Sequence, residues 1–478
     1  MIFNSLDFGL FLPIIFALYW FVFNKSLKKQ NLLLLIVSYV FYGWWDWRFL
    51  SLIAFSTLVD FIIGNQLLKQ KGIAHRKLLL WISIGVNLGF LGFFKYYNFF
   101  LENFVDAFTF FGGSISSSSL NIILPVGISF YTFQTLSYTI DVYKGNIKAT
   151  NNFIDFAAFV SFFPQLVAGP IERATNLLPQ FYSKRTFSYA NSVIGMRQIL
   201  WGLVKKVVIA DSCAFYANEI FNNHQDYSGS TLLLGGVFFA FQIYGDFSGY
   251  SDIAIGTSRL FGFKLLQNFS FPYFSRDMAE FWRRWHISLN TWFRDYLYIP
   301  LGGSRGNLFF KLRNVFIIFI VSGFWHGANW TFIAWGALNA FYFVPLMVFG
   351  INRNNTDVIA YTNIKDAFVI ALKILGTFLL TVLAWIFFRS ENITQALEII
   401  ASIFSMSLFS APMVLPKTAI LLVGLFMVIE WFGRNQEFAI EKFSLFKYRS
   451  LRYGCYVILS ALIYISHSSG KEFIYFQF

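Results

Sequence analysis

The sequence predicts an all-α polytopic membrane protein with about 11–13 membrane segments, and three observations support this prediction. The chain of 478 residues is 57% apolar and only 13% charged, which is about half the charged share of a soluble domain. Its mean hydropathy is +0.57. Aromatic residues reach 21%, led by 64 Phe, as suits lipid-facing surfaces and interfacial belts. This composition excludes a soluble enzyme, a disordered chain and a secreted disulfide scaffold.

Apolar runs that approach the length of a membrane span, about 20 residues, recur along the whole chain. They lie near 6–23, 31–47, 49–68, 78–95, 121–141, 153–168, 193–211, 231–256, 311–322, 324–349, 369–388, 416–433 and 453–467. Several are shorter than a full span, and 97–112 and 395–411 are ambiguous. We therefore expect some segments to enter and leave the membrane on one side. No linker, repeat or charge block divides the chain, so we expect one membrane domain over 1–478.

Basic residues give the chain a formal charge of +13 and fall in short segments between apolar runs. The positive-inside rule explains this distribution without a nucleic-acid partner, and the expected partner is membrane lipid. Three basic segments, 25–29, 69–77 and 434–452, would be cytoplasmic. Both the N-terminus and the C-terminus are then expected outside the cytoplasm.

Residues 270–305 interrupt the apolar pattern and are too polar to span lipid. Glu280 stands four residues from both Arg276 and Arg284, at helical pairing distance. Large aromatic residues are interleaved with these charges, which predicts an amphipathic helix at the cytoplasmic membrane face. A simple interfacial anchor fits the same composition.

His326 differs from the other four histidines because long apolar stretches flank it on both sides. An ionisable side chain at membrane depth is costly and usually faces a cavity or the bundle interior. A catalytic base and a neutral imidazole bonded between helices fit this position equally. Gly323 and Gly327 would permit close backbone approach, as a narrow substrate path needs.

Other chemistries have no sequence support. The chain has no zinc-ligand spacing, nucleophile elbow, P-loop or Rossmann glycine string, and Cys213 and Cys455 are far apart, so we expect no metal. General-base chemistry on an acyl acceptor or carrier remains. Asp246 and Asp252 also lie in an apolar run, where each costs about 2.5–3.5 kcal/mol on insertion scales. They could line a polar tunnel or pair with buried Arg, and the structural role is favoured.

Two strings contain His286 and His326: FWRRWHISLNTWFRDYLYIPLGGSRG at 281–306 and GFWHGANWTFIAWG at 323–336. They resemble the membrane-bound O-acyltransferase (MBOAT) family, most closely its bacterial alginate O-acetyltransferase subunit I branch. Similar stretches in the same order are ILPVGISFYTFQTLSYTIDVYKG at 123–145, FFPQLVAGPIERATNLLPQF at 162–181 and YGDFSGYSDIAIG at 244–256. The resemblance implies a multi-helix MBOAT fold around a transmembrane tunnel. It also implies that His326 is the catalytic histidine and that His286 is the second characteristic polar position.

The end of the chain, Phe473-Ile-Tyr475-Phe476-Gln-Phe478, resembles the F-x-Y-F-x-F tail of this branch. The resemblance implies that Tyr475 can carry the acyl group as an ester, whereas an arbitrary tyrosine here would be an interfacial anchor. A phenol has a pKa of about 10, so its ester is more activated than a sugar ester and less than a thioester. The residues from Ser466 to Tyr475 can reach roughly 30 Å, about twice the half-thickness of the hydrocarbon core.

The resemblance implies an O-acyltransferase in the bacterial inner membrane that takes acetyl from acetyl-coenzyme A and serves an extracytoplasmic polysaccharide. Arg283, Arg284 and Trp285 are expected to bind the donor, because arginines attract the coenzyme's phosphates. The tail over 468–478 is expected to act as an acyl carrier on the outer face, with an SGNH-hydrolase-like partner that finishes the transfer. Two alternatives remain: a D-alanyl transfer protein of the teichoic-acid type, and a polytopic transporter without covalent chemistry.

Overall fold

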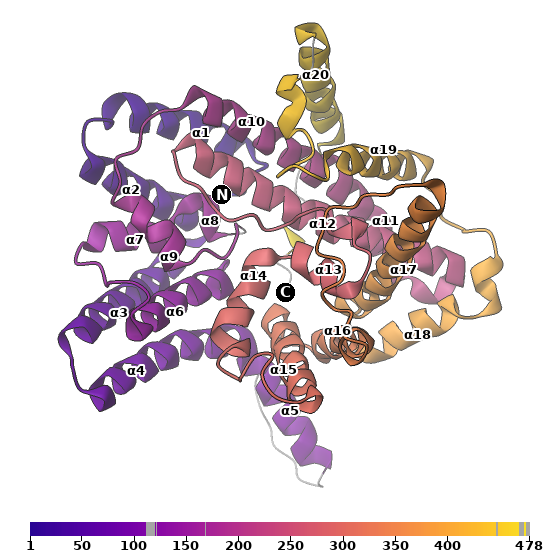
Figure 1. Ribbon diagram of the computed structural model, residues 1–478, viewed down its shortest axis with the longest axis horizontal. Coiled ribbons are helices and arrows are strands. Elements are labelled where there is room, and N and C mark those ends of the chain that lie inside the picture. The colour runs from indigo at the N-terminus through magenta and orange to yellow at the C-terminus, as the bar shows by residue number, and fades with distance from the viewer. Residues whose placement is uncertain (111–119, 121, 168, 446–447, 468–472, 475–478) are drawn as a thin grey trace. The chain divides into compact units, whose positions relative to one another are not determined.

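The computed structural model describes all residues except 111–119, 121, 168, 446–447, 468–472 and 475–478 (Figure 1). The described residues form helices joined by loops and contain no strand, which confirms the all-α class. They form two compact units, residues 1–195 with 257–266 and residues 196–256 with 267–478. The single domain over 1–478 stays a prediction.

Six helical segments are long and apolar enough to cross a membrane. They are Leu27–Lys69, Ile73–Phe110, Gly229–Leu260, Leu308–His326, Trp330–Val348 and Ile364–Arg389. Their number confirms the multi-pass character of the protein. The count of 11–13 segments stays a prediction, because shorter apolar helices such as Phe153–Leu166 are not among the six candidate spans. The tunnel also stays a prediction.

In the first unit, several helices pack against α6. Its helices are α1 (Leu6–Ala17), α2 (Leu27–Asp46), α3 (Leu50–Lys69), α4 (Ile73–Leu91), α5 (Tyr97–Phe110), α6 (Ile128–Lys144), α7 (Phe153–Ser161), α8 (Phe163–Leu166) and α9 (Ala174–Leu177). Both α3 and α4 pack against α6, and α2 packs against α7. The buried carboxylate of Asp60 on α3 accepts hydrogen bonds from Ser83 Oγ at 2.5 Å, Asn87 Nδ2 at 2.9 Å and Thr139 Oγ1 at 3.0 Å. A buried charge requires such partners, and here they join α3, α4 and α6.

The second unit contains both histidines of interest. Its helices are α11 (Asp211–Asn222), α12 (Gly229–Leu260, ending in the first unit), α13 (Met278–Arg284), α14 (Ile287–Phe293), α15 (Leu308–His326), α16 (Trp330–Val348), α17 (Ile364–Arg389), α18 (Ile393–Ile403), α19 (Lys417–Gly433) and α20 (Arg449–Ser466). The chain enters this unit along α10 (Tyr189–Leu203) and the π-helix η5 (Val204–Ala210).

Helices α15 and α16 form a tightly packed hairpin (Figure 1). A Cβ atom at Gly323 would lie 2.2 Å from the carbonyl oxygen of Phe332, and one at Gly336 would lie 2.3 Å from that of Phe319. A Cβ atom at Gly327 would meet the Phe332 ring at 2.1 Å. The close approach expected at Gly323 and Gly327 is therefore confirmed, but the partner is α16 and not a substrate.

Candidate active site

The segment 270–305 does not form the single amphipathic helix that its sequence predicts. Helix α13 ends at Arg284 and α14 begins at Ile287. Between them His286 has φ 44° and ψ 53°, a left-handed conformation that is rare outside glycine. The Phe and Trp residues of this segment are buried in the second unit, together with Tyr273, whereas Tyr296 and Tyr298 are half-buried. Strained backbone of this kind tends to occur at functional sites.

One hydrogen bond fixes the ring of His286. Its Nδ1 lies 3.1 Å from Asn268 Oδ1, while Asn268 Nδ2 donates to Ser251 Oγ at 3.0 Å. The Asn268 oxygen also accepts from Ser288 Oγ at 2.8 Å. Because an amide oxygen can only accept, the His286 proton is on Nδ1 and Nε2 presents a lone pair. Within the described part of the chain, Nε2 has no hydrogen-bond partner.

Burial keeps His286 uncharged. Its side chain is 1% exposed, and burial lowers its pKa from 6.5 to about 3. The cause is removal from water, which disfavours the charged imidazolium. At physiological pH His286 is therefore a neutral acceptor.

His326 lies at the end of α15 and is 4% exposed. Its ring centroid lies 5.2 Å from that of Trp335 and 5.3 Å from that of Phe388, both in edge-on arrangements. The centroid of His286 is 6.5 Å away, and Trp325 is close to both rings. The structure thus brings the two histidines together among aromatic rings, and we call the group of His286, His326, Trp325, Trp335 and Phe388 the aromatic chamber.

One described residue of the carboxy-terminal tail, Phe473, lies close to this chamber. Phe473 is fully buried, with its ring centroid 4.3 Å from that of Tyr250 and 6.2 Å from that of Phe247. The Phe247 ring in turn lies 4.7 Å from His286. Phe473 is therefore separated from His286 by one ring. Tyr475 lies outside the described residues, and its role stays a prediction.

Asp246 and Asp252 pair with lysines and not with the arginines that the sequence suggested. Lys206 Nζ lies 2.7 Å from Asp246 Oδ1 and 2.9 Å from Asp211 Oδ1. Lys205 Nζ lies 2.7 Å from Asp252 Oδ2. Sequence reasoning missed both lysines, although an adjacent pair inside the apolar run GLVKKVVIA is the signal that could have revealed them.

The predicted donor-binding residues divide between two places. Arg283 donates to the carbonyl oxygens of Asn352 at 3.1 Å and Asn355 at 2.7 Å, and Arg284 pairs with Glu280 at 2.7 Å. Both arginines line a cavity of about 390 Å³ with Ser270, Glu280, Asn355, Thr356, Asp357, Val358, Ile359, Arg434, Asn435 and Gln436. Trp285 is not among these residues. It packs inside, with its ring centroid 5.0 Å from those of Phe269 and Trp385.

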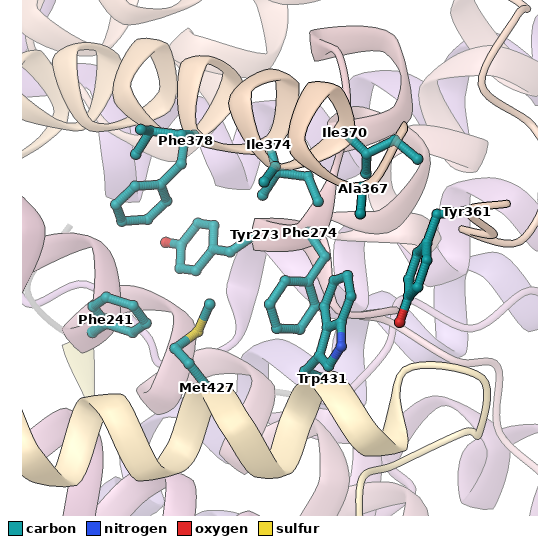
Figure 2. A pocket seen from close by; sticks show the side chains of 12 residues that line it. Phe241, Tyr273, Phe274, Tyr361, Ala367, Ile370, Ile374, Phe378, Met427 and Trp431 are labelled. Atoms are coloured by element: carbon teal, nitrogen blue, oxygen red, sulfur yellow. The ribbon is translucent and has the colours of Figure 1, made fainter. Parts of the chain in front are cut away.

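A second, apolar cavity of about 500 Å³ lies between α17 and α19 (Figure 2). Figure 2 shows Ile374 and Phe378 projecting from α17 toward Met427 and Trp431 on α19, with Tyr273 between them. Neither histidine lines it. The cavity is therefore distinct from the aromatic chamber.

The chemistry available in the chamber is that of two imidazoles enclosed by aromatic rings. Among the described residues, no group of three or more His, Cys, Asp or Glu side chains is arranged to hold a metal ion. Cys213 is buried and Cys455 is half-buried, and both are free thiols. Proton transfer by histidine is the function that the arrangement supports.

Sequence comparisons identify the family. The profile of the membrane-bound O-acyltransferase family matches residues 147–383. The probable alginate O-acetylase AlgI of Pseudomonas aeruginosa is 43% identical over 85% of this chain and 75% of its own length. The corresponding Azotobacter vinelandii protein is 40% identical over 92% and 86%, and a peptidoglycan O-acetyltransferase of Helicobacter pylori is 36% identical over 82% and 77%. The chain belongs to the membrane-bound O-acyltransferase family and is a multi-pass membrane O-acyltransferase.

Proposed function

We propose that the protein takes an acetyl group from acetyl-coenzyme A on the cytoplasmic side, carries it on Tyr475 and delivers it for O-acetylation of an extracytoplasmic polysaccharide. The observation that carries this proposal is the aromatic chamber with its two histidines and the docked tail residues Phe473 and Ile474 nearby. Tyr475 is the next residue in the chain.

The first transfer needs a base. At pH 7 about 0.1% of an ordinary phenol is ionised, so Tyr475 requires His326 to accept its proton as the phenolic oxygen attacks the thioester carbonyl. The new bond is the phenyl ester, and the C–S bond breaks. The proton then passes from His326 to the departing thiolate.

His286 would support this step by hydrogen bonding. Its Nε2 lone pair can accept a bond from the phenol or from a protonated group beside it. A centroid separation of 6.5 Å between the two imidazoles is compatible with both rings bonding one small group between them. The aromatic walls exclude water, which protects the ester from hydrolysis.

The cavity of about 390 Å³ lined by Arg283 and Arg284, which we call the polar cavity, is the proposed donor site. Arg283, Arg284 and Arg434 line it, against the carboxylates of Glu280 and Asp357. Its net positive charge would attract the phosphates of coenzyme A. Trp285 would contribute only indirectly, through the aromatic packing next to His286.

Charge-neutralising variants test this donor site. Arg283→Gln and Arg434→Gln should raise the donor KM, and the difference from wild type should shrink at high salt, where screening weakens the attraction. Arg305→Gln provides a control, because that residue does not line the cavity. Loss of membrane yield with an unchanged KM would mean that these arginines only support the fold.

The second transfer is proposed to occur outside the cytoplasm, in the bacterial inner membrane with both termini on the outer side. The names of the relatives support a polysaccharide acceptor. In this step a sugar hydroxyl attacks the ester, the acyl group leaves Tyr475 and the phenol regains a proton. An SGNH-hydrolase-like partner is proposed to present that hydroxyl.

A D-alanyl transfer protein is the second candidate, since it would use the same chamber with a carrier-protein donor. The RRWH…RDYLYIPLGG string and the tail within the same chain favour the acetyl branch. A transporter without covalent chemistry would leave the buried histidine pair and the docked tail unexplained.

The decisive experiment is mass spectrometry of the purified protein after single-turnover incubation with labelled acetyl-coenzyme A. We expect acetyl on the C-terminal peptide at Tyr475, and we expect Tyr475→Phe to abolish both this label and polymer acetylation. Tyr464→Phe, at an exposed residue of α20, is the matched control. An active Tyr475→Phe variant together with an unlabelled wild-type tail would refute the carrier. Labelling only by a D-alanyl carrier protein would select the second candidate.

A further inference from the structure

Two neighbouring lysines of η5 organise two similar buried ion clusters in the second unit. The Lys205 cluster contains Asp252 and Glu430, whose nearest oxygens lie 2.7 Å and 3.8 Å from Nζ. The Lys206 cluster contains Asp246 and Asp211. Among the described residues, each joins one ammonium to two carboxylates, whose formal charges sum to −1, and hydrogen-bond donors can stabilise these carboxylates.

The donors at the Lys205 cluster are side chains on helices of the unit. Gln198 Nε2 donates to Asp252 Oδ1 at 2.9 Å. Tyr244 OH and Trp201 Nε1 donate to Glu430 at 2.5 Å and 3.1 Å. This cluster is satisfied by residues whose positions the helices fix, as a purely structural network requires.

At the Lys206 cluster, a donor comes from the tail. The backbone N–H of Ile474 donates to Asp246 Oδ2 at 2.6 Å, while Asp246 Oδ1 holds Lys206. Tyr250 reinforces the contact, because its ring lies 4.3 Å from that of Phe473 and 5.8 Å from Lys206 Nζ. The two described tail residues therefore make one polar contact, from the Ile474 N–H to Asp246, and one aromatic contact, from Phe473 to Tyr250.

We propose that Asp246, held by Lys206, is the docking residue for the carboxy-terminal tail, and that it positions the tail at the histidine chamber through the Ile474 N–H. Asp246 is thus a positioning residue, and its effect on acyl transfer rests on the proposed carrier role of Tyr475. A backbone N–H group that is buried in a dry interior, as that of Ile474 is, must have a hydrogen-bond acceptor. A carboxylate provides a strong acceptor for one of them.

If Asp246 binds the backbone N–H of Ile474 and not its side chain, substitutions at this position should differ in their effects. Ile474→Ala keeps the N–H donor and should keep docking, whereas Ile474→Pro removes the donor. On the receptor side, Asp246→Asn keeps an amide oxygen as acceptor, and Asp246→Leu has none. Asp252→Asn is the matched control, because it disturbs the sister cluster, which does not touch Ile474.

The test measures docking separately from chemistry. In the full-length protein in nanodiscs, hydrogen exchange of the C-terminal peptide should be about tenfold or more faster in Asp246→Leu and Ile474→Pro than in wild type, since a bond to a charged acceptor is lost. Asp252→Asn and Ile474→Ala should retain protection. Single-turnover acetylation of Tyr475 should fall in the same two variants and remain in the two controls.

A double-mutant cycle distinguishes docking from general stabilisation. If Asp246 acts through the tail, the Asp246→Leu/Ile474→Pro double variant should be no worse than the poorer single variant. The proposal would be overturned if the effects of the two single variants multiplied in the double variant. It would also be overturned if the C-terminal peptide of Ile474→Pro kept the full wild-type protection from hydrogen exchange. Loss of protection in both variants with no acetyl-Tyr475 in wild type would instead retain the docking role and refute the carrier. Ile474→Pro keeps the test decisive should Asp246→Leu fail to fold.

Discussion

The two histidines of the chamber are held in opposite ways. His326 ends the 19-residue helix α15, where the aligned backbone carbonyls place the negative end of the helix dipole. His286 lies immediately before the short helix α14, where the dipole is reversed, and Asn268 fixes its proton on Nδ1. The carbonyl end of a helix is favourable for positive charge and the amide end is not, so the two rings differ in the helix end that they adjoin.

This difference indicates that the two histidines have different roles in the reaction, although their side chains are chemically identical. A general base must gain a positive charge during the reaction, which the end of α15 tolerates. A neutral imidazole with a fixed tautomer is better suited to orient a substrate by accepting a hydrogen bond. We therefore propose that His326 transfers the proton and that His286 orients the substrate, and the following variants test this assignment.

The largest effect is expected for His326→Ala. Removal of a general base typically costs 10²–10⁴-fold in rate, so acetyl transfer to Tyr475 and to polymer should be nearly abolished while the protein remains in the membrane. The measurement is single-turnover transfer normalised to folded protein. His224→Ala is the control, because His224 pairs with Glu398 outside the chamber. Near-normal transfer by a well-expressed His326→Ala variant would contradict the assignment.

His286→Ala should have a smaller effect, on the order of 10²-fold, as expected for lost orientation. His286→Gln, whose side-chain oxygen can still accept a hydrogen bond, should recover part of that loss. No glutamine can replace His326, since an amide does not take up the proton. Equal losses in both His286 variants would indicate that His286 itself transfers protons.

Sequence reasoning predicted the fold class and the local charge pairing better than the geometry of the site. The apolar composition predicted the all-α class, and the pairing of Glu280 with Arg276 and Arg284 at helical spacing is confirmed, at 2.9 Å and 2.7 Å. The break at His286 was not predictable, because Trp-His-Ile contains no glycine or proline to signal it. Tertiary contacts to Asn268 stabilise it instead.

The docking site of the tail could not be predicted from the sequence either. The motif YGDFSGYSDIAIG predicted that Asp246 is important, but its partners, Lys206 and the Ile474 N–H, are 40 and 228 residues away in the chain. Contacts at such separations follow from helix packing, which periodicity does not determine. The predicted tunnel and the side of each terminus depend on the membrane itself and stay proposals.

Asn268→Ala should cost up to about tenfold, less than either histidine variant, because it removes one hydrogen bond that orients His286. The loss should appear in the rate of transfer and leave the donor KM unchanged, since Asn268 does not line the polar cavity. Ser288→Ala is the control, because it removes a different hydrogen bond to the same Asn268 oxygen and leaves the bond to His286 in place. A raised KM with a normal rate would place Asn268 in donor binding.

The smallest expected effect concerns pH. Because burial lowers the pKa of His286 to about 3, this residue stays neutral from pH 5 to 8 and cannot produce an acid limb in kcat/KM within that range. His286→Gln should therefore lower the whole profile by one constant factor and leave the midpoint of any acid limb in place. Asn268→Ala should do the same, because His286 remains neutral without that bond. A midpoint that moves by about one pH unit or more in His286→Gln would show that His286 titrates in the working enzyme. Proton transfer would then have to be reassigned from His326 alone to the coupled pair.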